Sequence, residues 1–212
     1  GITDAFGIPG AGINPGYKEL ASSQITHYCV RHEEAAVHAA DGYFRASGKM
    51  AVAICTSGPG ATNFVTGVYT ANVDSIPLIA LTGQAVTSQL GKDAFQCVDI
   101  AKICAPVAKA TFCVTDPQNI VEVMQKAFML AKSGKPGVVV IDLPLDVQMA
   151  EVDYDMANYQ PLVFENPRPA QVAIRQAIEM IRAAKRPTLI MGGGVILAKA
   201  ARGCVAFAEL MQ

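Results

Sequence analysis

The sequence predicts an α/β fold in which a parallel sheet carries helices on both faces. Short apolar runs of β-forming residues alternate along the chain with stretches of helical periodicity. The apolar runs are hydrophobic at nearly every position, which is typical of strands that are buried on both faces. Hydrophobic residues make up 51% of the 212 residues, which is enough for a sizeable core.

The predicted elements follow one another in a regular order. Strands are expected at residues 4–9, 25–30, 50–56, 76–83 and 137–144, where apolar and β-branched residues gather. Helices are expected between several of these strands, at residues 14–22, 33–46, 61–72 and 117–133. Strands that alternate with helices in this way favour a parallel sheet over an antiparallel one.

The chain changes character after residue 148. Residues 149–170 are polar, contain three prolines and show no clear period, so they predict a linker between domains. A helix at 170–185, a strand at 186–194 and a helix from 197 are expected next, and they are too few to bury a core alone. We therefore expect a first domain at 1–148 and, at 171–212, the truncated start of a second α/β domain of a longer protein.

The charge and the cysteine content of the chain limit the kinds of function that are expected. The formal net charge is −1, and no Lys/Arg block is interleaved with aromatic residues, so no nucleic-acid partner is expected. No signal peptide opens the chain, and no apolar run reaches the roughly 18 residues that a membrane span needs. The six cysteines form no CxxC pair and are expected to be reduced, buried thiols. A cytoplasmic protein that acts on small molecules is expected.

Two glycine-rich turns are candidate ligand sites. In "GIPGAGINPG", at residues 7–16, Gly10 and Gly12 follow a predicted strand, but Pro15 stands where a dinucleotide fingerprint needs its third glycine. An NAD site is therefore weakly supported. In "TSGPGATN", at residues 56–63, a strand leads into a helix, and the backbone N–H groups could face an anion or polar ligand. A simple tight turn between strand and helix remains the alternative.

The segment "CVRHEEAAVHAADGY" places two unlike glutamates at a helix start. Helical spacing puts Glu34 on a polar stripe with His38, where a solvated ion pair is expected. The same spacing puts Glu33 on an apolar stripe. Burial favours its neutral form and the helix dipole favours its ion, so Glu33 could exchange a proton near neutral pH. A glutamate that only caps the helix is the alternative.

Several co-linear motifs together resemble one family. They are "FGIPGAGINPGY", "RHEEAAVHAADGYFRASGK", "TSGPGATNFVTG", "DSIPLIALTGQ", "GKDAFQCVDI" and "SGKPGVVVIDLPLDVQ". Their order and spacing resemble the N-terminal pyrimidine-binding domain of thiamine-diphosphate enzymes, in the branch of acetolactate synthase (acetohydroxyacid synthase) and glyoxylate carboligase. The resemblance covers essentially the whole chain, and "RPTLIMGGGVI" resembles the start of the middle domain of that family.

The resemblance implies a thiamine-diphosphate-binding fold and a carboligase that decarboxylates one 2-oxo acid and condenses it with another. Glu33 matches the glutamate that in the family bonds to N1′ of the aminopyrimidine and so promotes loss of the thiazolium C2 proton. Gln96 matches a catalytic position, which lines the substrate pocket together with Phe95. Cofactor contacts are implied for Gly10, Ala11, Glu33, Gly58, Pro59, Asn63 and Lys135.

The resemblance also carries expectations about cofactors and assembly. FAD is a possible second cofactor, although Lys135 stands where family members use an arginine fork. Magnesium is expected on a GDG motif of a C-terminal domain, so no metal ligand is assigned within these 212 residues. A homodimer or homotetramer with its active site at the subunit interface is implied, and this part of the protein alone is expected to be inactive.

The branch of the family stays open at the level of sequence. Glyoxylate carboligases carry valine at the position of Glu33, which favours an acetolactate synthase-like enzyme. Val86 and Cys97 depart from acetolactate synthases, which usually have a proline and an acidic residue there. Glyoxylate carboligase (tartronate-semialdehyde synthase) is the alternative. A non-catalytic binding or assembly module of the same fold is a further alternative.

Overall fold

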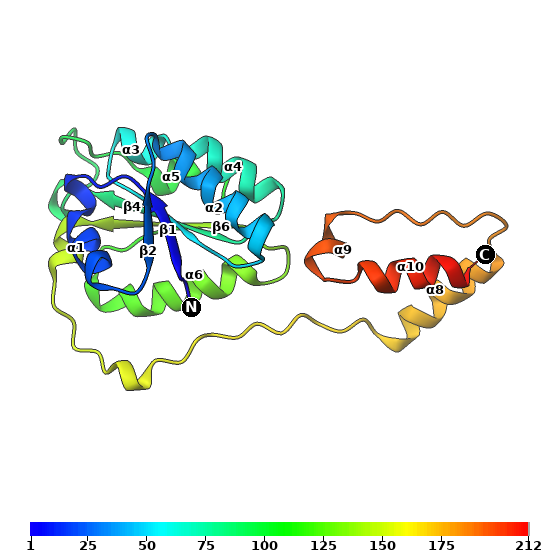
Figure 1. Cartoon of the computed structure of the whole chain (residues 1–212). Coiled ribbons are helices and arrows are strands. Elements are labelled where there is room, and N and C mark those ends of the chain that lie inside the picture. Colours follow the sequence, from blue (N-terminus) through cyan, green and yellow to red (C-terminus); the bar gives the residue numbers. More distant parts are fainter. Residues whose placement is uncertain (212) are drawn as a thin grey trace. The chain divides into compact units, whose positions relative to one another are not determined.

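A computed structural model of the chain describes residues 1–211, and of Met156 it describes the backbone only. The chain divides into two compact units, Gly1–Glu165 and a second unit that begins at Asn166 (Figure 1). The first unit contains the sheet and the candidate site. No helix among residues 1–211 combines the length and the apolar character that crossing a membrane requires.

The first unit is built on a six-stranded, wholly parallel sheet, as the sequence predicts. The strand order is β2-β1-β3-β4-β6-β5. The strands are β1 (Asp4–Gly7), β2 (Thr26–Cys29), β3 (Val52–Cys55), β4 (Leu78–Gln84), β5 (Ala110–Cys113) and β6 (Val138–Pro144). β6 is buried along its whole length, because it lies between two other strands and beneath helices on both faces.

Helices cover both faces of the sheet (Figure 1). One face carries α2 (Glu33–Ser47), α4 (Val65–Val73) and α5 (Ile100–Cys104). The other carries α1 (Asn14–Ser22), α6 (Ile120–Lys132) and α7 (Leu145–Met149). Short helical turns complete the unit: η1 (Ala11–Ile13), α3 (Pro59–Thr62), η2 (Thr87–Gln89), η3 (Pro117–Asn119) and η4 (Met156–Asn158).

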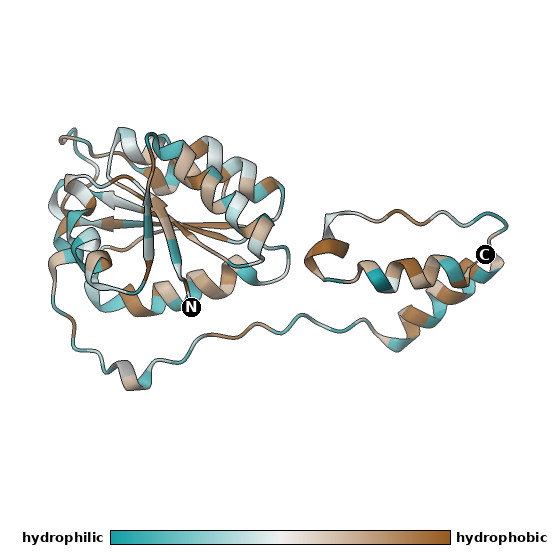
Figure 2. Ribbon diagram, in the orientation of Figure 1, coloured by the Kyte–Doolittle hydropathy of each residue, from teal (hydrophilic) through white to brown (hydrophobic). Residues whose placement is uncertain are grey.

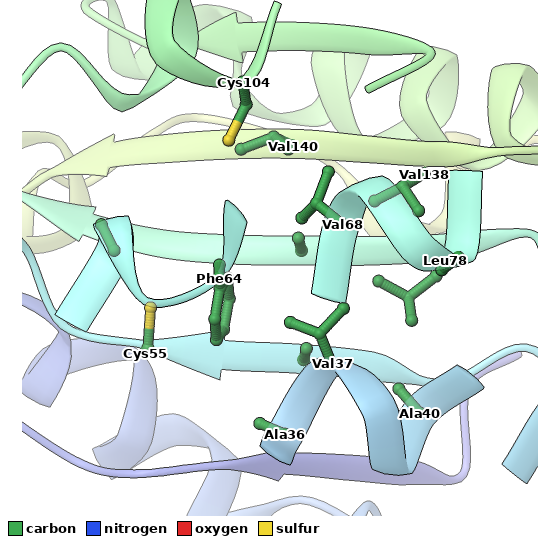
Figure 3. Close-up of a cluster of buried hydrophobic side chains, with 14 of the residues drawn as sticks. Ala36, Val37, Ala40, Cys55, Phe64, Val68, Leu78, Cys104, Val138 and Val140 are labelled. Atoms are coloured by element: carbon green, nitrogen blue, oxygen red, sulfur yellow. The ribbon is translucent and has the colours of Figure 1, made fainter. Parts of the chain in front are cut away.

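Each face of the sheet has its own apolar core. Beneath α2 and α4, Val37 and Val68 pack with Phe64 over Leu78 and Val138 of the sheet (Figure 3). The second core lies beneath α6 and α7 and includes buried residues of β4 and β6. Figure 2 shows the strands as mostly hydrophobic and the helices as mixed, which is the pattern of helices with one buried face.

The cysteines depart from the sequence-based expectation of burial. All six are free thiols, but only Cys55 and Cys104 are buried. Cys29 and Cys113 are exposed, and each ends one of the two outermost strands of the sheet. An apolar run in the sequence therefore overestimates burial where the run lies on an outer strand.

Several elements differ from their predicted form. The helix expected at 61–72 is two helices, α3 and α4, separated by a turn at residues 63 and 64. β5 and α5 were not predicted, since each has only four or five residues and carries little periodic signal.

The second unit is helical where the structure describes it. It contains α8 (Gln171–Ala183), α9 (Gly193–Leu197) and α10 (Ala201–Leu210). The strand predicted at 186–194 is wrong: residues 186–192 form no strand, and Gly193 begins α9. A strand needs a hydrogen-bonded neighbour, and among the described residues of this unit none provides one.

Candidate functional site

The sheet topology places a switch point, the candidate crevice, at the carboxyl ends of β1 and β3. From β1 the chain continues to β2 on one side, and from β3 it continues to β4 on the other. The loops that follow the two strands therefore diverge and leave a switch point between them. In open α/β sheets such a point is the usual place for a ligand. Both glycine-rich turns found in the sequence start here.

The backbone of the first glycine-rich turn lies directly against side chains of the second. The N–H of Gly12 donates to Oγ1 of Thr56 over 3.1 Å. A Cβ on Gly10 would lie 2.6 Å from Cβ of Thr56, and one on Gly12 would lie 2.7 Å from Oγ of Ser57. Any larger residue at either position would push the turns apart, because the backbone of Gly10 and Gly12 lies against the side chains of Thr56 and Ser57. Ala11, between them, is exposed at this edge.

Glu33 projects from the start of α2 toward this crevice. Nδ2 of Asn63 donates to Oε2 of Glu33 over 2.8 Å, and the side chain is half-buried rather than fully buried. Among residues 1–211 no donor is hydrogen-bonded to the other oxygen, Oε1. A Cβ on Gly60 would lie 3.3 Å from that oxygen. The absence of a side chain on Gly60 keeps one face of the carboxylate open.

Glu33 does not cap its helix. The N-cap is His32, whose Nδ1 accepts a hydrogen bond from the N–H of Glu34 over 3.2 Å. This cap was not predicted from the sequence, because histidine is not among the usual capping residues. Glu34 pairs with His38 over 3.4 Å, and both side chains are 40% exposed, which confirms the solvated pair that was predicted. The two glutamates therefore differ as the helical spacing indicates.

Gln96 packs directly against Gly58 on the turn after β3. Gly58 has a φ of +61°, and a Cβ there would lie 2.8 Å from Cβ of Gln96. Gln96 itself has a φ of +54°, which is rare for a residue with a side chain. Oγ of Ser57 donates to Oε1 of Gln96 over 3.5 Å. The neighbouring Phe95 is 87% exposed.

Most of the predicted site residues share this edge of the sheet. They are Gly10, Ala11, Glu33, Gly58, Pro59, Asn63 and Gln96, with Phe95 beside Gln96. Lys135 is separate from them, because it lies between α6 and the start of β6 and so at the amino end of a parallel strand. There it lines a surface pocket with Lys109 and Ser133.

A buried polar cluster next to the crevice was not predicted. Asp142 on β6 accepts hydrogen bonds from Oγ1 of Thr82 over 2.7 Å and from Nε2 of Gln84 over 2.8 Å. Burial raises the pKa of Asp142 to about 6, although the two hydrogen bonds act in the opposite direction. A single acid inside the apolar run "VVVIDLP" is the signal in the sequence that could have revealed it.

Comparison of the sequence with known proteins finds relatives in the thiamine pyrophosphate enzymes. Residues 1–103 match the family described as thiamine pyrophosphate enzyme, N-terminal TPP binding domain. A glyoxylate carboligase of Escherichia coli O157:H7 is 46% identical over 212 residues, which cover 99% of this chain and 36% of that protein.

Acetolactate synthases match equally well. A probable acetolactate synthase large subunit of Methanococcus aeolicus is 46% identical over 216 residues, covering 98% of this chain and 35% of that protein. The acetolactate synthase large subunit of Corynebacterium glutamicum is 47% identical over 211 residues, covering 96% of this chain and 33% of that protein. The chain thus spans about a third of the length of these relatives.

Proposed function

We propose that this chain, which belongs to the thiamine pyrophosphate enzymes of the acetolactate synthase and glyoxylate carboligase branch, forms the pyrimidine-binding part of a decarboxylating carboligase. The whole enzyme would release CO₂ from one 2-oxo acid and join the remainder to a second. The observation that carries the proposal is the carboxylate of Glu33, which faces a glycine-lined crevice with one oxygen free among residues 1–211.

The open side of the Glu33 carboxylate is compatible with the flat aminopyrimidine ring of thiamine diphosphate. Gly58 and Gly60 present backbone without side chains, and a Cβ on either would fall within 3.3 Å of Gln96 or Glu33. Oε1 of Glu33 can accept a hydrogen bond from a ring nitrogen, while Asn63 keeps Oε2 occupied and the carboxylate oriented. When bound, thiamine diphosphate supplies a carbon that adds to the carbonyl group of a 2-oxo acid and holds the electrons released with CO₂.

The residues of this chain then have distinct tasks. Glu33 holds a proton at the ring nitrogen that it faces, which a carboxylate can do and an amide cannot. Gln96 offers amide donor and acceptor groups beside the crevice, where a substrate carboxylate or carbonyl needs them. Phe95, which is largely exposed, supplies an apolar wall for the substrate.

Further cofactors and the assembly are parts of the same proposal. Magnesium and the diphosphate are held by residues outside these 212, and a second subunit covers the crevice in a homodimer or homotetramer. If FAD binds, Lys135 contacts it at the amino edge of the sheet, away from Glu33. The enzyme works in the cytoplasm on small 2-oxo acids.

The presence of Glu33 favours an acetolactate synthase-like reaction over the glyoxylate carboligase alternative. Identity does not separate the two, since it is 46–47% to relatives of both names. The alternative of a non-catalytic module, in which Glu33 serves only as a helix cap, loses its main support because His32 provides the cap.

The products formed by the full-length protein test the proposal. The protein is supplied with thiamine diphosphate and magnesium and given pyruvate or glyoxylate, and acetolactate and tartronate semialdehyde are measured. We expect acetolactate from pyruvate. Tartronate semialdehyde alone would assign the protein to the alternative branch, and the absence of CO₂ release from either acid would reject the carboligase.

A further inference from the structure

The segment that carries Phe95 and Gln96 is a 15-residue loop, residues 85–99, between β4 and α5. A loop of this length has many accessible conformations unless its ends are fixed. Hydrogen bonds hold both ends of this loop. At one end Gln84 bonds to the loop backbone and to Asp142 of β6, and at the other end Asp146 of α7 bonds to the loop directly.

Gln84 holds the far end of the loop. Its Nε2 donates to the backbone oxygen of Val98 over 2.6 Å and to Oδ2 of Asp142 over 2.8 Å, and its Oε1 accepts from the N–H of Ala85 over 2.8 Å. Two acceptors on one side and one donor on the other allow a single orientation of the amide. All its polar groups are thus engaged.

Asp142 keeps Gln84 in this orientation. It lies opposite Thr82 in the β4–β6 register, and the Thr82 hydroxyl donates to its Oδ1 over 2.7 Å. Asp142, Thr82 and Gln84 are each at most 2% exposed. Hydrogen bonds in such a buried network are costly to break, because the freed groups find no water. The network therefore acts as a rigid support.

Asp146 holds the near end of the loop. Its Oδ1 accepts from the N–H of Thr87 over 2.9 Å, and its Oδ2 accepts from the hydroxyl of the same residue. The two contacts to one residue fix both the backbone and the side chain of Thr87, where η2 begins. With Val98 held at the other end, both ends of the intervening loop are fixed.

We propose that Asp142, through Gln84, and Asp146, through Thr87, are positioning residues that fix Gln96 against Gly58 at the candidate site. Gln96 lies two residues before Val98, and it is held in a left-handed conformation in contact with Gly58. An unsupported loop would relax this conformation, which is unfavourable for a residue with a side chain. The kinetic test of this proposal rests on the proposed function, whereas the hydrogen-exchange test does not.

Hydrogen exchange and kinetics of the full-length protein test the proposal. Gln84→Met keeps the size of the side chain and removes its donors, while Gln89→Met makes the same change at an exposed position of the same loop. Because three hydrogen bonds of the buried Gln84 side chain are lost, we expect amides of residues 94–100 to exchange at least about tenfold faster in Gln84→Met and within about twofold of the parent in Gln89→Met.

The kinetic readout separates positioning from a general loss of structure. Glu33 and Asn63 lie outside the loop, so Gln84→Met should leave the dissociation constant for thiamine diphosphate within about twofold while kcat falls at least about tenfold. Unchanged exchange in residues 94–100 overturns the proposal, whatever the activity. If the full-length protein has no carboligase activity, the proposed function is rejected, but the hydrogen-exchange measurement still tests whether Gln84 holds the loop.

A second variant covers the case in which Gln84→Met does not fold. Asp146→Ala removes the support of Thr87 at a partly buried site, and Asp93→Ala is its exposed control in the same loop. We expect the amides of residues 86–90 to exchange faster than in the parent in Asp146→Ala but not in Asp93→Ala. Equal exchange in the two variants would contradict the proposal.

Discussion

Glu33 and Glu34 are adjacent in the sequence, yet the helix gives them opposite surroundings. Successive helical residues point about 100° apart, so one glutamate turns toward the crevice and Asn63 while the other turns toward His38 and water. Gly60 keeps the Glu33 carboxylate accessible, since a side chain at this position would crowd it. At this scale the site is defined by which atoms are left free to bind a ligand.

Asp142 shows how burial changes the chemistry of a single residue. Its pKa is raised to about 6, chiefly because burial removes water from the carboxylate. Below about pH 4 the group is protonated in both folded and unfolded chains. Between about pH 4 and 6 the folded chain binds the proton more tightly, so its contribution to stability is lost as the pH rises through this window.

Asp142→Asn should remove this pH dependence. The difference in free energy of unfolding, variant minus parent, is expected to rise by on the order of 3 kcal/mol between pH 4 and pH 7. Urea unfolding of the chain at pH 4, 5, 6 and 7 measures it. The exposed Asp93→Asn is the control, and its difference should stay flat. A flat difference for Asp142→Asn as well would show that the carboxylate titrates normally.

At the scale of elements, the site is assembled by loops that leave the carboxyl ends of parallel strands. The turns after β1 and β3 meet through glycines, and the loop after β4 brings Gln96 onto Gly58. The strands are rigid because β3, β4 and β6 are paired on both sides. Loop residues on a rigid sheet can hold strained conformations such as that of Gln96.

Gly58→Ala and Gly91→Ala compare a glycine in contact with Gln96 with one that has open space around it. Both glycines have positive φ, +61° and +74°, but a Cβ meets Gln96 only at Gly58, while space around Gly91 is open. We expect Gly91→Ala to cost about 1 kcal/mol of stability and Gly58→Ala at least about twice that. Gly58→Ala should also lower kcat/KM at least about tenfold. Thermal unfolding measures the stability and steady-state rates measure kcat/KM. Equal losses of stability in the two variants would contradict the contact between Gly58 and Gln96.

Much of the sheet could be predicted from sequence, because β3, β4 and β6 are apolar on both faces and β1 and β2 precede clear helical periods. β5 could not, since its four residues mix polar and apolar types. The glycine turns and Glu33 were visible as local patterns. Their partners were not, because the contacts from Asn63 to Glu33 and from Gln84 to Asp142 join residues far apart in the sequence.

At the scale of the whole molecule, the two units differ in how they are stabilised. Gly1–Glu165 has a sheet with an apolar core on each face, whereas the described part of the second unit has three helices and no buried residue in them. The strand predicted at 186–194 illustrates the difference, because an apolar run forms a strand only beside a partner. The chain spans about a third of the length of its relatives.

Limited proteolysis of the 212-residue chain with a glutamate-specific protease should cut first after Glu151 and Glu165. Both are exposed and lie outside helices and strands, so the protease can bind them in an extended form. Glu19 is equally exposed but lies within α1, and it serves as an internal control. Mass spectrometry of the first fragments identifies the sites. Early cleavage after Glu19 would contradict the stability assigned to the first unit.

We propose Glu33 as the carboxylate that acts on thiamine diphosphate. The most direct measurement compares Glu33→Gln with Glu34→Gln in the full-length protein, with cofactor, magnesium and pyruvate at saturation. Because an amide cannot hold the proton, we expect acetolactate formation to fall at least about a hundredfold in Glu33→Gln and to stay within about twofold of the parent in Glu34→Gln. Equal rates of acetolactate formation in the two variants would contradict the role proposed for Glu33.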